Sequence, residues 1–331
     1  MTLASIPADR LVLLLGAPRS GTTWLAKIFD SHPDVLYRHE PDTVLRDQRM
    51  QNYFSPEDIP RFRPAAEAYL RRLMDTRTLK TVGSLPVFAK SYYSPTVQGT
   101  RRGMIYGLRG AEKLGAARFV KNIAIPDLLD PAEHPNLRVV MKSVSSRGRT
   151  RLFAEALAGC RVIYIVRDPC GQVASLMRGA ALGKFEDEIY PEELLHTEQA
   201  ARYGLTEERL RALPRVEQLA WAWAILNEKA IDDLAGLDTA KVIRYQDLCV
   251  RPMEVAKDLL AFAGLSWNEQ TEAFIGESTR SNAPDRYYQV FKNTETAMNK
   301  WRTELAPEDQ QRIIAVVRET KMRALCPEYE F

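Results

Sequence analysis

Glycine, serine and threonine residues gather in a short segment directly after the first apolar run of the chain. The apolar run covers residues 11–15, and the segment that follows reads Gly-Ala-Pro-Arg-Ser-Gly-Thr-Thr-Trp at positions 16–24. Gly16 and Gly21 have the spacing of the phosphate-binding loop G-x-x-x-x-G-K-[ST]. Threonine stands where that loop has its lysine, and a cation comes earlier, at Arg19. The segment therefore predicts an anion site that lacks one standard part of an ATPase.

This loop offers several kinds of donor to an anion. Gly21 permits backbone angles that other residues avoid, so the chain can approach the anion closely. A helix that starts there points its free N–H groups and the positive end of its dipole at the loop. Arg19 adds a planar cation suited to a tetrahedral anion, and hydroxyl groups come from Ser20, Thr22 and Thr23. A turn without a ligand is the alternative, which the flanking strand and helix disfavour.

A second candidate anion site follows another apolar run. Residues 162–166 are typical of a buried strand, and Arg167-Asp168-Pro169 comes at the carboxyl end of that run. Ser175 lies eight residues after Arg167, inside the helix expected next. An arginine at a strand end and a serine in the following helix can bind a phosphate together. The alternative is a surface ion pair between Arg167 and Asp168.

The elements that must position these residues alternate between strand and helix patterns along the chain. Apolar runs without strict alternation are typical of parallel strands that are covered on both faces. The expected strands cover residues 11–15, 35–37, 139–142, 162–166 and 241–244. Helical stripes of apolar residues predict helices over 216–234 and 253–263. We therefore predict an α/β protein of the P-loop type with three layers, in which helices cover both faces of a central parallel sheet.

Two segments do not follow this alternation. Residues 41–118 form a long, basic and aromatic stretch, and residues 180–214 are polar and mixed in charge. We expect both to be insertions, mainly helical or irregular, in a single domain that covers residues 1–331. In open α/β folds, ligands bind at the carboxyl edge of the sheet. We therefore expect both insertions over that edge, as lid elements for a substrate.

Composition excludes several classes of function. The chain has 331 residues, is 45% hydrophobic and 27% charged, and carries a formal net charge of +3, which does not favour nucleic acid as a partner. No apolar run reaches the length of a membrane span, so we expect a soluble protein without a transmembrane segment. The cysteines lack C-x-x-C spacing and predict neither a disulfide framework nor a metal site; they are Cys160, Cys170, Cys249 and Cys326. A reducing cytoplasm fits this pattern best.

Together the two anion motifs resemble those of sulfotransferases that use 3′-phosphoadenylyl sulfate (PAPS). In that family P-[KR]-S-G-T-T follows the first strand and binds the 5′-phosphosulfate, and here Pro18 begins the matching segment. The family's R-D-P, with a serine eight residues later, binds the 3′-phosphate, and Arg167 and Ser175 match it. The combination of both motifs is far more specific than either one.

Two further segments extend the resemblance toward the C-terminus. The segment from Arg244 to Leu265 is similar to the family's Y-E-D-L…P…F-x-G-L stretch, in which the tyrosine, here Tyr245, contacts the nucleotide. A glutamine replaces the family's glutamate in this stretch. The segment that contains Lys292 and Lys300 is similar to the loop that closes over the cofactor, so Lys300 is a further candidate for cofactor binding.

The resemblance implies a soluble, bacterial-type enzyme that takes PAPS as its sulfuryl donor, releases the nucleotide PAP and needs no metal. A transferring sulfuryl group carries fewer charges than a phosphoryl group, so protein cations and N–H groups can stabilise it without Mg²⁺. The implied cations are Arg19 and Lys142, with Lys142 beside the leaving phosphate. Trp24 stacks on adenine in such enzymes, but it also falls on the apolar stripe of the predicted helix, so core packing stays an alternative.

The base that receives the proton of the acceptor is expected at Glu40. Small-molecule sulfotransferases carry a histidine after a middle strand, and here Val144 occupies that position. Carbohydrate and tyrosyl-protein sulfotransferases carry a glutamate after the loop helix, and residues 32–41, His-Pro-Asp-Val-Leu-Tyr-Arg-His-Glu-Pro, resemble their motif. This glutamate comes just past a predicted strand, on the sheet edge expected for Lys142. His39, interpreted as a loop histidine, is the competing base, and a salt bridge is the alternative role for Glu40.

The glutamate-type motif favours a carbohydrate or glycoconjugate as the acceptor. A small-molecule or lipid hydroxyl is the alternative within the family. Basic and aromatic residues of the first insertion are candidates for lining an acidic or sugar-like substrate: Lys80, Lys90, Arg101, Arg102, Tyr92, Tyr93 and Tyr106. Two rival functions come from other classes. One is a P-loop kinase or NTPase with Asp168 as its metal-binding acid, and the other is an inactive nucleotide-binding partner protein.

Overall fold

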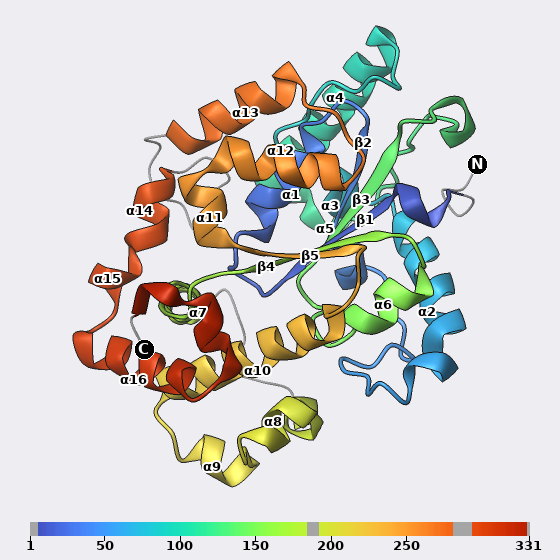
Figure 1. Cartoon of the computed structure of the whole chain (residues 1–331). Helices are drawn as coiled ribbons and strands as arrows, with labels where there is room; N and C mark the ends of the chain where they lie inside the picture. Colours follow the sequence, from blue (N-terminus) through green and yellow to red (C-terminus); the bar gives the residue numbers. More distant parts are fainter. Residues whose placement is uncertain (1–5, 184–191, 281–292, 330–331) are drawn as a thin grey trace.

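The computed structural model describes residues 6–183, 192–280 and 293–329 of the chain. Its centre is a sheet of parallel strands in the order β2-β3-β1-β4-β5 (Figure 1). The strands are β1 Leu11–Gly16, β2 Val35–His39, β3 Arg138–Ser143, β4 Arg161–Val166 and β5 Ala240–Arg244. Every strand expected from the sequence is present in this sheet, so the prediction of an α/β fold with a parallel sheet is confirmed.

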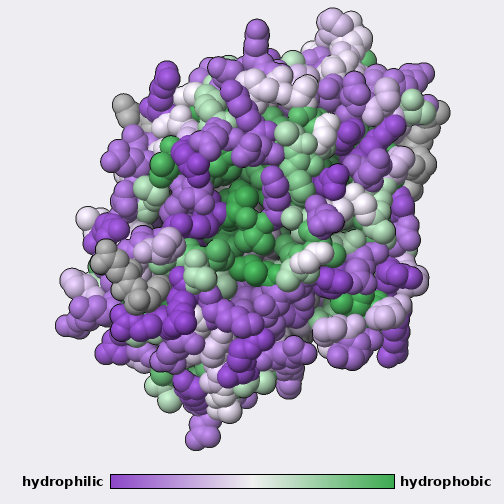
Figure 2. Space-filling view, in the orientation of Figure 1, coloured by the Kyte–Doolittle hydropathy of each residue, from purple (hydrophilic) through white to green (hydrophobic). Residues whose placement is uncertain are grey.

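The sheet forms because its inner strands are apolar on both faces. In β1, Leu11, Leu13 and Leu15 pack into a hydrophobic core on one face, while Val12 and Leu14 pack into a second core on the other. Parallel strands with helices on both faces need such continuous apolar runs. The end strand β5 is more exposed. Figure 2 shows an apolar area near the middle of a mostly hydrophilic face, where β5 lies in Figure 1.

Helices cover both faces of the sheet, which confirms the predicted three layers. On one face lie α1 Thr22–Asp30, α11 Tyr245–Val250, α12 Pro252–Phe262 and α13 Glu269–Arg280 (Figure 1). On the other face lie α2 Ile59–Met74, α6 Thr150–Ala156 and α10 Arg215–Leu234. The helices predicted over 216–234 and 253–263 are therefore α10 and α12. Gly264 follows α12 with a φ of 70°, a left-handed conformation that commonly ends helices.

A further group of helices packs against α10. It consists of α7 Pro169–Ala181, α8 Glu198–Arg202, α9 Glu207–Arg211 and α16 Pro307–Arg318. The segment 180–214 supplies α8 and α9, and Ala200 and Leu210 bury their side chains in the core that these helices share with α10. The described part of this insertion therefore belongs to the helical layer at the bottom of Figure 1.

The other insertion, 41–118, divides into two parts. Its first helix, α2, packs against α6 and buries Tyr69 and Leu70 in the core. Its second part continues into a small unit with its own apolar cluster, which includes Leu79 and Ile105. We call residues 79–120 the cover unit; its elements are α3 Leu79–Val82, α4 Pro95–Ala111, a π-helical turn Glu112–Ala116 and α5 Ala117–Val120.

The remaining elements are short. They are α14 Thr294–Asn299, α15 Trp301–Glu304 and the 3₁₀ turns Ala8–Arg10, Pro41–Thr43, Pro131–Glu133, Glu192–His196, Lys321–Leu325 and Pro327–Tyr329. None of the helices within the described ranges combines the length and the apolar character that crossing a membrane requires. All the cysteines of the chain are buried and free of disulfide bonds.

Candidate active site

One cavity of about 920 Å³ lies at the carboxyl edge of the sheet, and we call it the large cavity. Each strand contributes to its lining at or shortly beyond the strand's carboxyl end. Arg19 follows β1, Glu40 follows β2, Lys142 belongs to β3, Arg167 follows β4 and Tyr245 follows β5. The chain changes direction across the sheet beside β1, and ligands of open α/β sheets bind at such a point. The large cavity is therefore the expected place for a ligand.

The loop after β1 has a shape that requires glycine at one position. Gly21 has a φ of 91°, and a Cβ atom placed there would lie 2.3 Å from a ring carbon of Tyr245. Arg19 also has a positive φ, 70°, which residues other than glycine adopt rarely. Helix α1 begins directly after Gly21, so its free N–H groups face the loop. This geometry suits an anion bound at the start of α1.

The two anion sites predicted from the sequence meet at Arg19. The Nε of Arg19 donates a hydrogen bond to the Ser175 hydroxyl at 2.9 Å, and Nη1 of Arg167 donates to the Arg19 carbonyl oxygen at 2.9 Å. The Arg167 guanidinium lies 5.1 Å from the centre of the Tyr245 ring, and its Nη2 donates to the Ala297 carbonyl oxygen at 3.0 Å. We call Arg19, Arg167, Ser175 and Tyr245 the arginine cluster.

Other residues expected to bind the cofactor have mixed surroundings. Thr22 and Thr23 line the large cavity. The Ser20 side chain is fully buried, donates to the Ala17 carbonyl oxygen at 2.7 Å and does not line the cavity. Trp24 is buried in the core, which confirms the packing role, and it also lines the cavity, so the adenine contact stays a prediction.

Lys300 does not join the arginine cluster. Lys300 lies between α14 and α15, and its Nζ is 3.1 Å from the Glu304 carboxylate. It does not line the large cavity, to which α14 contributes Thr294 and Ala297 instead. Lys292, the other lysine of this segment, lies outside the described residues. The structure therefore brings α14 to the cavity without placing Lys300 there.

Glu40 and Lys142 meet where β2 and β3 end side by side. The backbone N–H of Glu40 donates to the Lys142 carbonyl oxygen at 2.9 Å, and the Lys142 ammonium donates to the Glu40 carboxylate. The same ammonium lies 3.3 Å from the Thr23 hydroxyl, to which it donates. Lys142 therefore connects the loop after β1 with the carboxylate expected to act as base.

The surroundings of Glu40 keep it ionised at neutral pH. Burial raises the pKa of a carboxyl group, but at Glu40 the positive charge of Lys142 opposes it. Lys80, whose Nζ lies 3.9 Å from the carboxylate, adds to the effect of Lys142, and the pKa of Glu40 is lower than its ordinary value. Burial also lowers the pKa of Lys142, against the attraction of Glu40. The site thus presents a carboxylate that is ready to accept a proton.

His39 is not in a loop, as interpreted from the sequence, but is the last residue of β2, and it lines the large cavity. Its Nδ1 lies 2.8 Å from the Tyr37 hydroxyl. Burial and, after it, the charge of Lys142 lower the pKa of His39 to about 3, so the imidazole is neutral at ordinary pH. The alternation of Tyr37 and His39 along one strand face was the sequence signal that could have placed His39 in the site.

Another wall of the large cavity comes from residues of the cover unit that sequence analysis missed. They are Ser84, Leu85, Arg109, Glu112 and Lys113. Arg109 is held firmly, since its Nη1 donates to Glu112 at 2.6 Å and its Nε donates to the Gly83 carbonyl oxygen at 2.9 Å. No local pattern marks these residues, because the fold of the cover unit brings them to the sheet edge.

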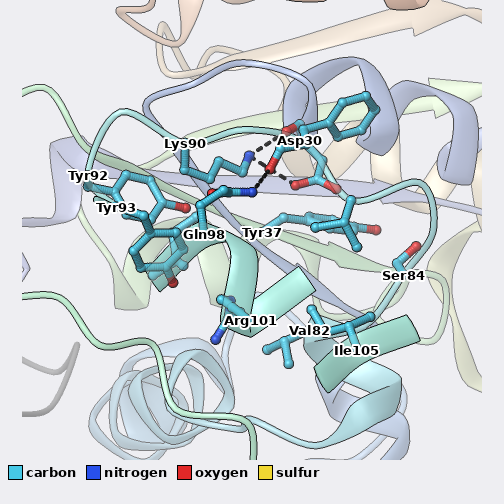
Figure 3. Close-up of a pocket in the computed structure, with 13 residues that line it drawn as sticks. Asp30, Tyr37, Val82, Ser84, Lys90, Tyr92, Tyr93, Gln98, Arg101 and Ile105 are labelled. Atoms are coloured by element: carbon cyan, nitrogen blue, oxygen red, sulfur yellow. Dashed lines mark hydrogen bonds and ion pairs between the residues drawn. The ribbon is translucent and has the colours of Figure 1, made fainter. Parts of the chain in front are cut away.

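The basic and aromatic residues expected at the acceptor are mostly elsewhere. Lys80 lines the large cavity. Four others line a separate cavity of about 40 Å³, which we call the small cavity (Figure 3): Lys90, Tyr92, Tyr93 and Arg101. In it Lys90 donates to the Asp30 carboxylate at 3.2 Å, so this lysine is already paired. Arg102 and Tyr106 line neither of the two cavities.

Asp168, the acid that the kinase alternative requires, does not line the large cavity. Its carboxylate accepts hydrogen bonds from the Gly171 N–H at 2.6 Å and from the Tyr329 hydroxyl, so it caps the start of α7. Burial raises the pKa of this carboxyl group. The surroundings of Asp168 are those of a structural helix cap and do not support the kinase alternative.

Known proteins resemble this chain over most of its length. The family model described as the sulfotransferase family matches residues 12–269. Carbohydrate sulfotransferase 5 of Mus musculus and carbohydrate sulfotransferase 6 of Homo sapiens are each 24% identical to it over 294 residues, which cover 86% of this chain and 71% of theirs. Mouse sulfotransferase SULT7A1, solved in complex with PAP, has a TM-score of 0.43 at 15% identity, covering 99% of this chain and 92% of its own.

The range matched by the family model includes the carboxyl ends of all the strands that line the large cavity. It also includes both anion motifs and Glu40. The match extends over well more than half of the chain. The chain therefore belongs to the sulfotransferase family.

Proposed function

We propose that this sulfotransferase transfers a sulfuryl group from PAPS to a hydroxyl group of a carbohydrate or glycoconjugate, with Glu40 as the general base. One observation carries the proposal: Lys142 is bonded both to the Glu40 carboxylate and to Thr23 of the anion-binding loop. Lys142 therefore links the proposed proton acceptor to the proposed site for the negatively charged sulfuryl donor. The similarity to carbohydrate sulfotransferases over 86% of the chain supports the acceptor class.

The arginine cluster and the loop after β1 fit a nucleotide that carries phosphate and sulfate groups. Arg19 and Arg167 are guanidinium groups, which bind such anions through paired N–H donors. Thr22 and Thr23 add hydroxyl groups at the start of α1, where the helix favours negative charge. Bound there, PAPS supplies the sulfuryl group and a phosphate leaving group. We assign Arg167 and Ser175 to its 3′-phosphate, and Arg19 with the loop to its phosphosulfate.

The aromatic side chains beside the loop are proposed for the adenine ring. Trp24 and Tyr245 meet edge to face with ring centres 6.3 Å apart, and both line the large cavity. Ser20 and Lys300 are left out of the proposed cofactor contacts, because neither side chain lines the cavity and each is bonded to a nearby partner in the chain. Ser175 does not line the cavity either, but it is kept because its hydroxyl accepts a hydrogen bond from Arg19, which does. The proposed donor site therefore keeps most, but not all, of the residues that the motifs suggested.

The chain's own charges carry the proposed chemistry. The Glu40 carboxylate accepts the proton of the acceptor hydroxyl while the hydroxyl oxygen bonds to sulfur and the bond from sulfur to the leaving phosphate oxygen breaks. General base catalysis of this kind contributes ~10²–10⁴-fold to the rate. Lys142 stabilises negative charge on the leaving phosphate oxygen, and Arg19 stabilises the sulfuryl oxygens. Because these cations already stand at the loop, we propose that transfer proceeds without a metal.

The charge of the large cavity favours an acidic acceptor. Among the described residues, six lysines and arginines line it, against two glutamates, and both glutamates are bonded to a cation. Lys113 is exposed on the cover unit, and no described carboxylate pairs with it. A carboxylate or sulfate group of the acceptor would complement this positive wall. We therefore propose a glycan that carries acidic groups near the hydroxyl that reacts.

Replacing Lys113 by glutamine is expected to lower kcat/KM for an acidic acceptor about threefold, because exposed ion pairs contribute on the order of 0.2–1 kcal/mol. The kcat/KM of a neutral acceptor with the same backbone is expected to stay the same. Initial rates with a uronic acid glycoside and its neutral counterpart measure this difference. Lys121→Gln is the control, since Lys121 directly follows the cover unit and is exposed but does not line the cavity. Equal losses for both acceptors would contradict an acidic specificity.

Thermal shifts with two nucleotides test the proposed donor. PAP without Mg²⁺ is expected to raise Tm by about 5 °C at a hundred times its Kd, whereas ATP with Mg²⁺ gives little shift. Arg167→Gln is expected to remove the PAP shift. Arg178→Gln, a change on α7 outside the cavity, keeps it. Stabilisation by ATP with Mg²⁺ alone would favour the kinase alternative instead.

A screen with labelled PAPS then tests the acceptor class. Label on glycans supports the proposed acceptor class, and stronger labelling of acidic than of neutral glycans supports the proposed acidic specificity. Label on a small-molecule or lipid hydroxyl would favour the alternative acceptor within the family. PAP binding without transfer to any hydroxyl compound would favour an inactive nucleotide-binding protein.

The cysteines support a location in the reducing cytoplasm, which we include in the proposal. All are buried and free of disulfide bonds. Burial raises the pKa of each thiol, so the thiols stay protonated and unreactive. Reduced, structural cysteines are typical of cytoplasmic proteins.

A further inference from the structure

A hydrogen bond between Tyr37 and His39 connects the two cavities. Strand β2 places both residues on the same face, two positions apart. Their rings meet edge to face with centres 5.9 Å apart, and the Tyr37 hydroxyl lies 2.8 Å from Nδ1 of His39. Tyr37 is 6% exposed and lines the small cavity (Figure 3), whereas His39 lines the large one. A buried tyrosine of the small cavity is therefore hydrogen-bonded to an imidazole ring that lines the large cavity.

The Tyr37 hydroxyl is the donor in this hydrogen bond. Burial raises the pKa of Tyr37 well above its ordinary value, so the hydroxyl keeps its proton. Within the described part of the chain, Nδ1 of His39 is its one hydrogen-bond partner. If Nδ1 carried a proton and donated it, the buried O–H of Tyr37 would have no acceptor among the described residues, and such unsatisfied donors are strongly disfavoured. Nδ1 is therefore unprotonated.

The proton of the imidazole ring is consequently on Nε2. The ring is neutral at ordinary pH because burial and the nearby Lys142 disfavour the imidazolium form. A neutral imidazole whose Nδ1 accepts a hydrogen bond presents a single N–H donor. None of the described residues accepts a hydrogen bond from Nε2. Because Nε2 already carries a proton, it cannot serve as the base, and Glu40 has no competitor at this position.

We propose that His39 is a specificity-determining residue whose Nε2–H donates a hydrogen bond to an oxygen of the acceptor beside the hydroxyl that reacts. Glu40 is the next residue in the chain and also lines the large cavity, so a proton acceptor and a proton donor stand side by side. A single hydroxyl can use Glu40 alone. Two neighbouring oxygens, as in a sugar 1,2-diol, use both groups. This inference rests on the proposed function, because it concerns an acceptor that reacts through a hydroxyl.

The state of His39 can be measured without any substrate. The chain has four histidines, so ¹⁵N–¹H spectra of the imidazole groups in the full-length protein are simple, and His39→Gln identifies the signal of His39. We expect the Nε2–H tautomer for His39 at neutral pH. In Tyr37→Phe, which keeps the ring but removes the hydroxyl, both tautomers are expected. An Nδ1–H tautomer or an imidazolium in the unmodified protein at neutral pH would overturn the inference.

Kinetics with paired acceptors test what the N–H group binds. His39→Leu removes the donor, and His39→Gln restores an amide N–H group. With a diol acceptor, His39→Leu is expected to lower kcat/KM about tenfold and His39→Gln to recover part of the loss. With a deoxy analogue that lacks the neighbouring hydroxyl, His39→Leu is expected to change kcat/KM little. Equal losses for both acceptors, without recovery by glutamine, would overturn the inference.

Failure of this inference and failure of the proposed function give different results. If no hydroxyl acceptor takes label from PAPS, the proposed function fails, and the acceptor contact of His39 fails with it while the tautomer stands. If transfer occurs and the His39→Leu protein keeps its preference for the diol, the specificity role alone is wrong. If calorimetry shows an unchanged Kd of PAP in both His39 variants, the loss of kcat/KM comes from the contact with the hydroxyl acceptor and not from binding of the nucleotide.

Discussion

Replacing Glu40 by glutamine is expected to lower kcat by about 10²–10⁴-fold while changing the Kd of PAP less than about twofold. Glutamine keeps the size of the side chain and an oxygen that can accept the hydrogen bond from Lys142, which the glutamate accepts in the structure. Its amide oxygen does not accept a proton at neutral pH. A selective loss of kcat therefore reports proton transfer and not donor binding.

The measurement compares product release and binding in matched variants. The rate of PAP release at saturating PAPS and acceptor gives kcat, and calorimetry gives the Kd of PAP. Glu112→Gln is the control, because Glu112 is the other carboxylate among the described residues that line the large cavity and is bonded to Arg109 at 2.6 Å. Its kcat is expected to stay within about threefold of the unmodified protein. Near-normal turnover in Glu40→Gln would remove Glu40 from the role of base.

The lowered pKa of Glu40 also sets the acid side of the pH profile. The ionised carboxylate is the active form, so kcat/KM falls only as the pH drops through a pKa that lies below the ordinary value of 4.5. Because the pKa of Glu40 is lower in the folded than in the unfolded protein, its carboxylate adds to the free energy of unfolding at pH values above the ordinary pKa. This addition is lost as the pH falls through the lowered pKa of the folded state. We therefore expect ionised Glu40 to support both activity and stability in mildly acidic solution.

Replacing Lys142 by methionine is expected to lower kcat by about 10²–10³-fold, the range found when one donor to a transition state is removed. Lys142 is 2% exposed in the centre of the site, and methionine is an unbranched side chain of similar length that can fill the same space. The variant loses the contacts of the ammonium with Glu40 and Thr23. The drop in kcat therefore measures the charge and not the packing of the strand.

The same variant is expected to move the acid limb of kcat/KM to higher pH. Burial raises the pKa of Glu40, and the charge of Lys142 is the main effect that lowers it. Removing that charge therefore raises the pKa of Glu40. Lys80→Met removes a cation 3.9 Å from the carboxylate and should move the limb in the same direction by less. A purely structural role of Lys142 would leave the limb in place, so an unmoved limb would contradict the proposed coupling.

The residues of the proposed donor site were predictable as neighbours at the sheet edge, because each belongs to a local motif. The loop at Gly21 and the arginine at Arg167 each sit between one strand and the helix that follows, so spacing alone places them at the carboxyl edge of a parallel sheet. The meeting of Arg19 with Ser175 follows from the adjacency of β1 and β4. Local patterns and sheet topology together were sufficient for these residues.

Membership of a sequence motif did not predict which side chains line the large cavity. Ser20 belongs to the loop motif, yet its hydroxyl is used by a carbonyl oxygen three residues earlier. Lys300 belongs to the C-terminal segment, yet its ammonium lies against Glu304, one helical turn away. In both cases the polar group is bonded to a nearby partner within the chain and does not line the cavity. This bonding depends on the turn and helix geometry that the segment adopts.

By itself the sequence determined the parallel sheet, the glycine loop after β1, the arginine after β4 and the place of Glu40 at the end of β2, since apolar periodicity and short spacings encode them. Only the tertiary structure decided that Arg109 and Lys113 of the cover unit form a wall of the large cavity, because that unit packs at the sheet edge through contacts distant in sequence. It also decided the proton position of His39. That position depends on the burial of Tyr37, which leaves its hydroxyl a single acceptor among the described residues.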